Sequence, residues 1–174
     1  MVASNMSFNP VNFKGTGKVN GLPVFVHQFP LTKGGYIDLD ATAGSAKFGR
    51  VVCVEASEKD AFKVGKTTDG VIAGILIADP SIMKADPTMN DYYFAGRPAT
   101  VCTFGLVQMS EWDTDLTGSV TPALGCVVVM NDTTGEIGFL AAGSSAPAGY
   151  TALTGVRVYD VDGPNGVTLF VDLI

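Results

Sequence analysis

The residue types that most often carry chemistry occur in this chain without the partners that they need. Gly65-Lys66-Thr67 matches the end of a phosphate-binding loop, in which backbone amides and a lysine hold phosphate oxygens. That motif also needs a glycine five residues before Gly65, where the chain has Asp60, and a helix after the threonine, where it has Asp69-Gly70. We therefore interpret this segment as a turn that carries an exposed lysine.

Three pairs of carboxylates are spaced so that each pair would share one face of a strand: Asp38/Asp40, Asp113/Asp115 and Asp160/Asp162. Such a pair can hold a hard cation, but the further oxygen ligands of a calcium loop are absent. Solvated strand ends are the favoured interpretation. His27, the only histidine, has no catalytic partner near it in sequence, and no serine or cysteine nucleophile signature occurs. The sequence predicts no enzyme, no metal site and no cofactor.

Composition favours an all-β protein. The 174 residues include 21 Gly, only 16% are charged, and Val, Ala and Thr dominate over the residues of long helices. A net charge of -6 without any basic run argues against nucleic-acid binding. The chain has no apolar run long enough to span a membrane and no signal-peptide pattern at its start, so we expect a protein that is made in the cytosol and is either kept or assembled into something there. Cys53, Cys102 and Cys126, each in a Val-rich pattern, are expected to be buried free thiols.

Residues 1–21 are interpreted as an N-terminal arm. Phe8, Val11 and Phe13 stand among Asn, Ser, Gly and Lys, and Pro10 interrupts any regular period. The arm is either a frayed terminus or a segment that docks on a neighbouring subunit or on a partner.

Residues 22–174 are expected to form a single β domain with an internal repeat, 48–109 and 124–174. Phe48–Val54 and Ala61–Val64 correspond to Leu124–Met130 and Ile137–Leu140. A Gly-led strand follows in each unit, at 74–77 and 155–158, and each unit closes with a Val-rich strand, at 100–107 and 166–173. Because neither unit can bury both faces alone, the two should pack together into a small β-barrel of about eight to ten strands. A half-buried strand is also expected over 36–40.

A tight turn, Thr67, Thr68, Asp69 and Gly70, separates two strand patterns in the first unit. Asp bonds its own backbone in such turns, and Gly reaches a positive φ without a Cβ clash. Gly74, inside the second strand, should allow another backbone or a bulky side chain to approach closely.

The segment 79–96 is the longest excursion from the strand pattern. Asp-Pro pairs predict one or two short helical turns, about 80–85 and 87–94, that end at Gly96. The excursion is rich in aromatic residues and methionine, as is the segment just after the next strand. These side chains either cover an open end of the barrel or make a subunit contact; the candidates are Met89, Tyr92, Tyr93, Phe94 and Trp112.

The segment Thr67–Leu76, preceded by Phe62-Lys63-Val64, resembles the signature of tailed-phage head decoration proteins, and the wider plan resembles the phage structural cement proteins. Ala95–Val101 also matches the start of a strand in that family. The resemblance implies a non-enzymatic β-tulip domain, usually a homotrimer, on the outer capsid surface of the virion. It further implies that the domain binds the major capsid protein and stabilises the expanded head against packaged DNA. Phe8, Pro10, Val11 and Phe13 are then the capsid-contact candidates, by location.

The alternative function is a β-sandwich module of a head fibre that binds glycans. In that case the aromatic residues at 92–94 and Trp112 would stack on sugars. A small hydrolase is the least favoured class, because no convergent catalytic groups are present.

Overall fold

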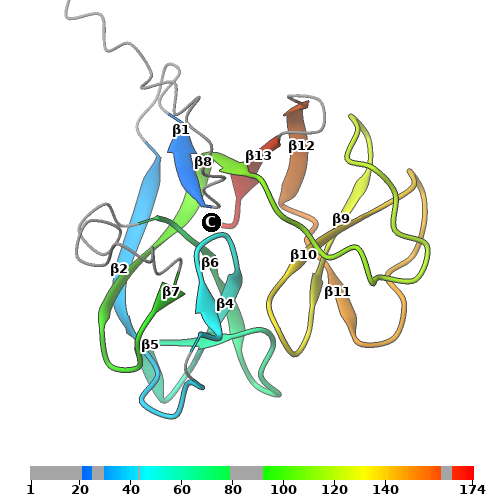
Figure 1. Ribbon diagram of the computed structural model, residues 1–174. Helices are drawn as coiled ribbons and strands as arrows, with labels where there is room; N and C mark the ends of the chain where they lie inside the picture. Colours follow the sequence, from blue (N-terminus) through cyan, green and yellow to red (C-terminus); the bar gives the residue numbers. More distant parts are fainter. Residues whose placement is uncertain (1–20, 25–29, 43, 79–91, 162–165) are drawn as a thin grey trace, which may run out of the picture.

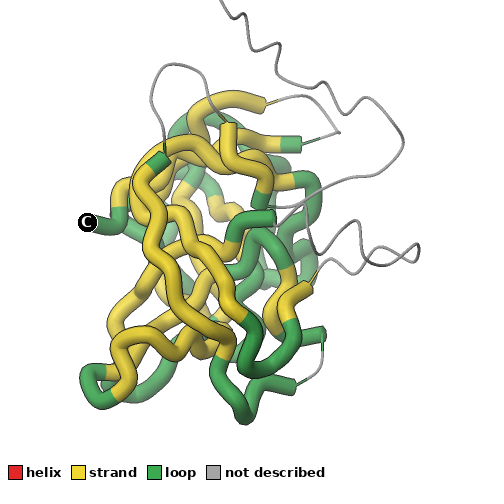
Figure 2. Tube along the Cα trace, turned by 90° about the vertical axis from the view of Figure 1, so that its left-hand side faces the viewer, coloured by secondary structure: helices red, strands yellow, loops and turns green. Residues whose placement is uncertain are grey.

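The computed structural model describes residues 21–24, 30–42, 44–78, 92–161 and 166–174, and within them every regular element is a β-strand (Figures 1 and 2). The strands are β1 (Leu22–Val24), β2 (Leu31–Ile37), β3 (Ala46–Lys47), β4 (Val51–Glu55), β5 (Glu58–Val64), β6 (Val71–Leu76), β7 (Tyr92–Tyr93), β8 (Pro98–Met109), β9 (Val127–Asn131), β10 (Ile137–Leu140), β11 (Tyr150–Ala152), β12 (Val156–Val161) and β13 (Val167–Asp172). The expected all-β class is confirmed. The described residues hold thirteen strands rather than eight to ten, because strands as short as β3 and β7 leave no periodic signal.

Five strands close into a barrel in the order β8-β2-β5-β4-β6 and back to β8. The pairs are antiparallel except for β2 and β5, where Tyr36 is opposite Ala61 in a parallel register. Closure occurs between β6 and β8, where Ile75 is opposite Cys102. The expected small closed β-barrel is therefore confirmed.

Strand β8 belongs both to the barrel and to the sheet beside it. Its first half pairs with β2 and β6, whereas its second half pairs with β13 and β1. Gly105, with φ 127°, lies between the two halves, and a Cβ there would be 3.0 Å from the Cα of Pro30. A glycine at this position lets the long strand change partners beside a close backbone neighbour.

The strand order of the first unit recurs in the second. The barrel strands β5-β4-β6 have the same arrangement as the three-stranded sheet β10-β9-β11, which lies to one side of the barrel in Figure 1. The strand expected at 155–158 is β12, but it pairs with β13; the third strand beside β9 is instead Tyr150–Ala152. Three residues are too few for this strand to be found from periodicity.

The loop between β9 and β10 contacts the start of β4 and the segment just after β5 through the backbone. The Val51 amide donates to the Gly135 carbonyl at 2.8 Å, and the Lys66 amide donates to the Asp132 carbonyl at 2.8 Å. Arg50 adds an ion pair, with its Nη2 2.6 Å from the Glu136 carboxylate. These contacts fix the second unit against one end of β4 and β5.

The described residues form three apolar clusters, the smallest of which contains Leu116, Val129 and Leu140. One lies inside the barrel and includes Ile37, Phe62 and Val101. The largest one joins residues of the barrel to residues of the second unit, among them Ile75, Phe139 and Leu169. The packing of two apolar faces that the repeat predicted thus occurs at this largest cluster.

Two expected elements differ from the structure. The strand predicted over 36–40 ends at Ile37, and Asp38 begins a turn in which its carboxylate accepts a hydrogen bond from the Asp40 amide at 2.8 Å. The helical turn predicted over 87–94 is wrong at its end, since Tyr92–Tyr93 is a strand that pairs with β3. Residues 79–91, which hold the rest of both predicted helical turns, lie outside the described part, as do residues 1–20 of the arm.

Candidate functional site

The turn at 67–70 is present, but it does not form a paired hairpin. Gly70 donates to the Thr67 carbonyl at 3.3 Å, and the flanking strands β5 and β6 both pair with β4 instead of with each other. Gly70 does not have the positive φ that we predicted; that conformation occurs at Gly65, with φ 77°. Gly70 is needed because a Cβ there would collide with the Thr67 hydroxyl, which is itself buried without a hydrogen-bond partner.

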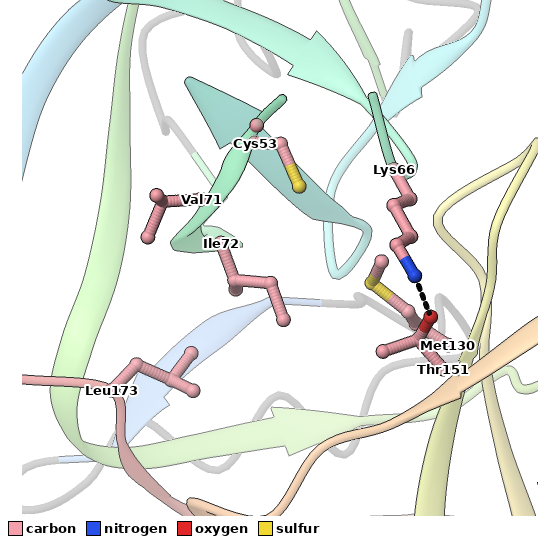
Figure 3. Close-up of a pocket in the computed structure, with 8 residues that line it drawn as sticks. Cys53, Lys66, Val71, Ile72, Met130, Thr151 and Leu173 are labelled. Atoms are coloured by element: carbon pink, nitrogen blue, oxygen red, sulfur yellow. Dashed lines mark hydrogen bonds between the residues drawn. The ribbon is translucent and has the colours of Figure 1, made fainter. Parts of the chain in front are cut away.

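Beside this turn lies a pocket of about 400 Å³ (Figure 3). Its walls come from both units and are mainly apolar: Cys53, Lys66, Gly70, Val71, Ile72, Met130, Thr151 and Leu173. The Lys66 ammonium donates to Thr151 Oγ1 at 3.2 Å, and the Thr151 hydroxyl donates to Asp132 Oδ1 at 2.6 Å. The lysine that resembled a phosphate-binding residue therefore serves a contact between the two units.

The cysteines have the environment of structural thiols. Cys53 and Cys102 are buried and free, as predicted, whereas free Cys126 is only half-buried. Burial raises the pKa of the Cys53 thiol, and it raises the pKa of Cys102 to about 11. Both groups stay protonated at neutral pH, which makes them poor nucleophiles.

Two of the aromatic subunit-contact candidates pack inside this chain. Tyr93 is 3% exposed, its hydroxyl donates to the Ile77 carbonyl at 2.9 Å, and its ring lies edge-on to Phe48. Trp112 is half-buried and lies edge-on to Phe139, with 6.0 Å between ring centroids. Much of the apolar surface of these two side chains is thus used within the chain's own fold.

The other described aromatic candidates lie on the surface and form part of an apolar patch. Phe94 is 44% exposed and contacts Tyr92 edge-on, with 5.1 Å between ring centroids. Beside them stands Leu39, 75% exposed, whose side chain lies against Gly96, while the Gly96 amide donates to the Ile37 carbonyl at 2.8 Å. Sequence reasoning missed Leu39 because it treated residues 36–40 as one strand, in which Leu39 would share the buried face of Ile37.

Next to this patch is an open groove of about 580 Å³, lined by Tyr36, Asp38, Leu39, Asp40, Glu55, Ser57, Glu58 and Lys63. Four carboxylates face one ammonium. Lys63 Nζ lies 3.2 Å from the Glu55 carboxylate and 3.6 Å from that of Asp38, and the interaction with Glu55 raises the pKa of the lysine. The groove therefore combines a surplus of negative charge with an exposed leucine and a tyrosine.

One carboxylate of each pair accepts a hydrogen bond from a nearby backbone amide. Asp38 and Asp113 each accept a hydrogen bond from the amide two residues later, and Asp160 accepts one from the Val161 amide. Asp113 is the most constrained of them: it is 8% exposed and accepts from the Tyr150 hydroxyl at 2.8 Å. Within the described ranges, no group of three or more His, Cys, Asp and Glu residues is placed to hold a metal ion.

Several predicted residues lie outside the described part of the chain. These are His27, the capsid-contact candidates Phe8, Pro10, Val11 and Phe13, and the subunit-contact candidate Met89. Among the residues that the structure does describe, no helix has the length and apolar character required to cross a bilayer.

Comparison with known protein families gives one match. Residues 28–171 match the family described as "Structural cement protein (E217 gp24/Pam3 gp6)". A chain from the solved structure described as "The capsid of Myoviridae Phage XM1" has a similar fold, with a TM-score of 0.61. The two sequences are 14% identical, and the match covers 94% of this chain and 98% of that chain. No curated protein sequence matches. Since the family match spans most of the sequence and supports a structural role in the capsid, the chain belongs to the structural cement proteins of phages.

Proposed function

We propose that this protein binds the outer surface of the phage head and stabilises the expanded capsid against the pressure of packaged DNA. The observation that carries the proposal is the family match over residues 28–171, together with a closed barrel that suits a rigid cement. A rigid unit loses little conformational entropy when it binds, so many modest contacts repeated around a shell hold it by avidity.

The direct partner in this proposal is the major capsid protein, and the protein acts without catalysis, cofactor, nucleic acid or membrane. The chain is made in the cytoplasm of the bacterial host and is then added to the head. The net charge of -6 supports accumulation in the cytoplasm without nucleic-acid binding, because an acidic protein stays soluble at high copy number and is repelled by nucleic acid.

The arm supplies one capsid contact. Phe8, Pro10, Val11 and Phe13 are its apolar anchors, and they pack against the head when the arm binds. Deletion of residues 1–20 should leave the fold intact, since the core clusters of the described residues lie between Ile37 and Val171.

The protein acts as a homotrimer of β-tulip domains, and the surface at Tyr92 and Phe94 contributes to the subunit contact. Phe94 is 44% exposed, and interfaces are enriched in aromatic residues. Met89 belongs to the same proposed contact by its proximity in sequence.

The test is co-sedimentation of the purified protein with expanded empty heads. We expect saturable, stoichiometric pelleting of the full chain and weaker pelleting of the chain that lacks residues 1–20, with an unchanged circular dichroism spectrum. A full chain that stays in the supernatant would contradict the proposed function. Equal pelleting of the two proteins would reject the arm contact alone.

The glycan-binding alternative has less support, because Tyr93 and Trp112 pack against this chain's own residues instead of offering open rings.

A further inference from the structure

The acidic groove described above and the apolar patch next to it make one continuous surface. Tyr36 and Leu39 line the groove, and Leu39 also lies against Gly96, in the turn that carries Phe94. The turn is closed by the Arg97 amide, which donates to the Phe94 carbonyl at 3.1 Å. An exposed leucine beside exposed aromatic rings is the kind of apolar surface that marks an interaction site.

The charge of the groove restricts what can bind there. Asp38 and Glu55 are partly neutralised by Lys63, which lies within 4 Å of both. Asp40 and Glu58 are exposed members of the same lining, and they leave the groove with excess negative charge. A partner segment that brings lysine or arginine would be attracted, whereas an acidic one would be repelled.

A second copy of this chain is a poor match for the groove. Each copy carries a net charge of -6, so most of the surface of another copy would repel the acidic lining of the groove. The groove therefore favours a basic partner other than a second copy of this chain.

We propose that this groove, next to the Tyr92 and Phe94 surface assigned to the subunit contact, binds an exposed segment of the major capsid protein that carries lysine or arginine next to an apolar side chain. The apolar side chain packs on Leu39 and Tyr36, and the cation lies between Asp40 and Glu58. The inference rests on the proposed function, because the head is the partner proposed there. It adds a second contact that is independent of the arm and names its chemistry.

The experiment measures head binding by two groove variants of the full chain. Asp40→Asn combined with Glu58→Gln removes two charges and keeps both ion pairs of Lys63. The matched control, Asp69→Asn combined with Asp172→Asn, removes the same charge from two exposed carboxylates that do not line the groove. Leu39→Ser removes the apolar contact, and Leu124→Ser, 73% exposed elsewhere, is its control.

We expect the double groove variant to bind heads about five-fold more weakly at low salt, with a shallower dependence on salt, and its control to bind like the unmodified chain. Leu39→Ser should weaken binding about ten-fold at any salt concentration, with unchanged folding. Groove variants that bind heads as the unmodified chain does would overturn the inference and leave the proposed function standing. An unmodified chain that fails to bind heads would overturn both.

Two other occupants are distinguished in the same samples. If the double groove variant changes the molar mass of the free protein, measured by light scattering, and leaves head binding unchanged, the groove binds a second copy, and the inference is wrong.

The chain's own arm carries Lys14 and Lys18 and no acidic residue. If Lys14→Gln combined with Lys18→Gln weakens head binding and the groove variant then adds no further loss, the groove binds this arm, which also overturns the inference.

Discussion

Gly74 of β6 lies so close to Cys102 of β8 that a Cβ on Gly74 would stand 2.5 Å from the Cys102 carbonyl oxygen. This is the seam at which the barrel closes, next to the pair Ile75 and Cys102. The φ of Gly74 is 150°, a conformation that side chains rarely adopt. The sequence predicted that another backbone or a bulky side chain would approach Gly74 closely; the neighbours there are the Cys102 backbone and the Val101 side chain.

We predict that Gly74→Ala destabilises the protein by about 2–3 kcal/mol, because the new methyl group forces the two strands apart in a strained backbone. Urea unfolding measures the loss. Gly34→Ala is the matched control: Gly34 also lies in a barrel strand, but nothing stands within 4 Å of the position of its Cβ. Equal stability of the two variants would mean that the seam has room for a side chain.

The buried thiols predict a loss of stability at alkaline pH. The pKa of Cys102 is about 11 in the fold, against 9.0 for an unperturbed thiol. The folded state therefore binds the proton more tightly, and this contribution is fully present below pH 9 and is lost as the pH rises through 11. For Cys102 it amounts to about 2–3 kcal/mol.

The measurement is the free energy of unfolding at pH 8, 10 and 11 under reducing conditions. Cys102→Ala should lower stability at pH 8, because it leaves a cavity, but it should flatten the pH dependence. Part of the dependence of stability on pH should remain in Cys102→Ala, because burial also raises the pKa of Cys53. Cys126→Ala, at a half-buried site, is the control for the removal of a thiol as such. The same slope in Cys102→Ala as in the unmodified chain would contradict this assignment.

Because of the hydrogen bonds around Asp113, we predict that loss of the Tyr150 hydroxyl lowers the stability of the fold. Tyr150→Phe removes a donor 2.8 Å from the Asp113 carboxylate and leaves the Asn131 amide, at 3.3 Å, as a side-chain donor to the same oxygen. We expect a loss of about 1–2 kcal/mol in urea unfolding. Tyr159→Phe, at an exposed ring, should be neutral. A neutral Tyr150→Phe would show that water replaces the tyrosine at no cost.

We predict that the exposed aromatic surface at Phe94 is needed for the proposed trimer. Phe94→Ser should lower the molar mass measured by light scattering from that of a trimer toward that of a monomer, since it removes an aromatic ring from the proposed contact. Its own stability in the monomer should hardly change, because the ring is 44% exposed. Leu124→Ser should leave the molar mass unchanged. An unchanged mass for Phe94→Ser would remove this surface from the subunit contact.

The sequence predicted the parts of the fold that depend on local patterns. The apolar, Val-rich runs of the internal repeat located β4, β5, β6, β8, β9, β10, β12 and β13, and the order β5-β4-β6 of the first unit has a counterpart in β10-β9-β11. Pairings between distant segments were not predictable. Tyr36 pairs in parallel with Ala61, and β4 separates the strands that flank the turn at 67–70. No local pattern encodes which distant edge a strand meets.

The candidate site was predicted less completely, for reasons that individual residues make clear. Aromatic content drew attention to Tyr93, yet composition cannot tell that its hydroxyl reaches the Ile77 carbonyl inside the fold. The exposed position of Leu39 was missed because the alternation of apolar and polar residues continues past Ile37, where β2 ends. The groove joins β2 and the turn after it to β4 and β5, so its four carboxylates are not adjacent in sequence.

The central claim is that this protein reinforces the head. The most direct test is the temperature at which DNA-filled heads that lack the protein release their DNA, measured with a dye that fluoresces on exposed DNA. Saturating amounts of the full chain should raise that temperature, and the chain without residues 1–20 should raise it less at the same concentration. Heads that bind the full chain to saturation and still release their DNA at the original temperature would contradict the claim.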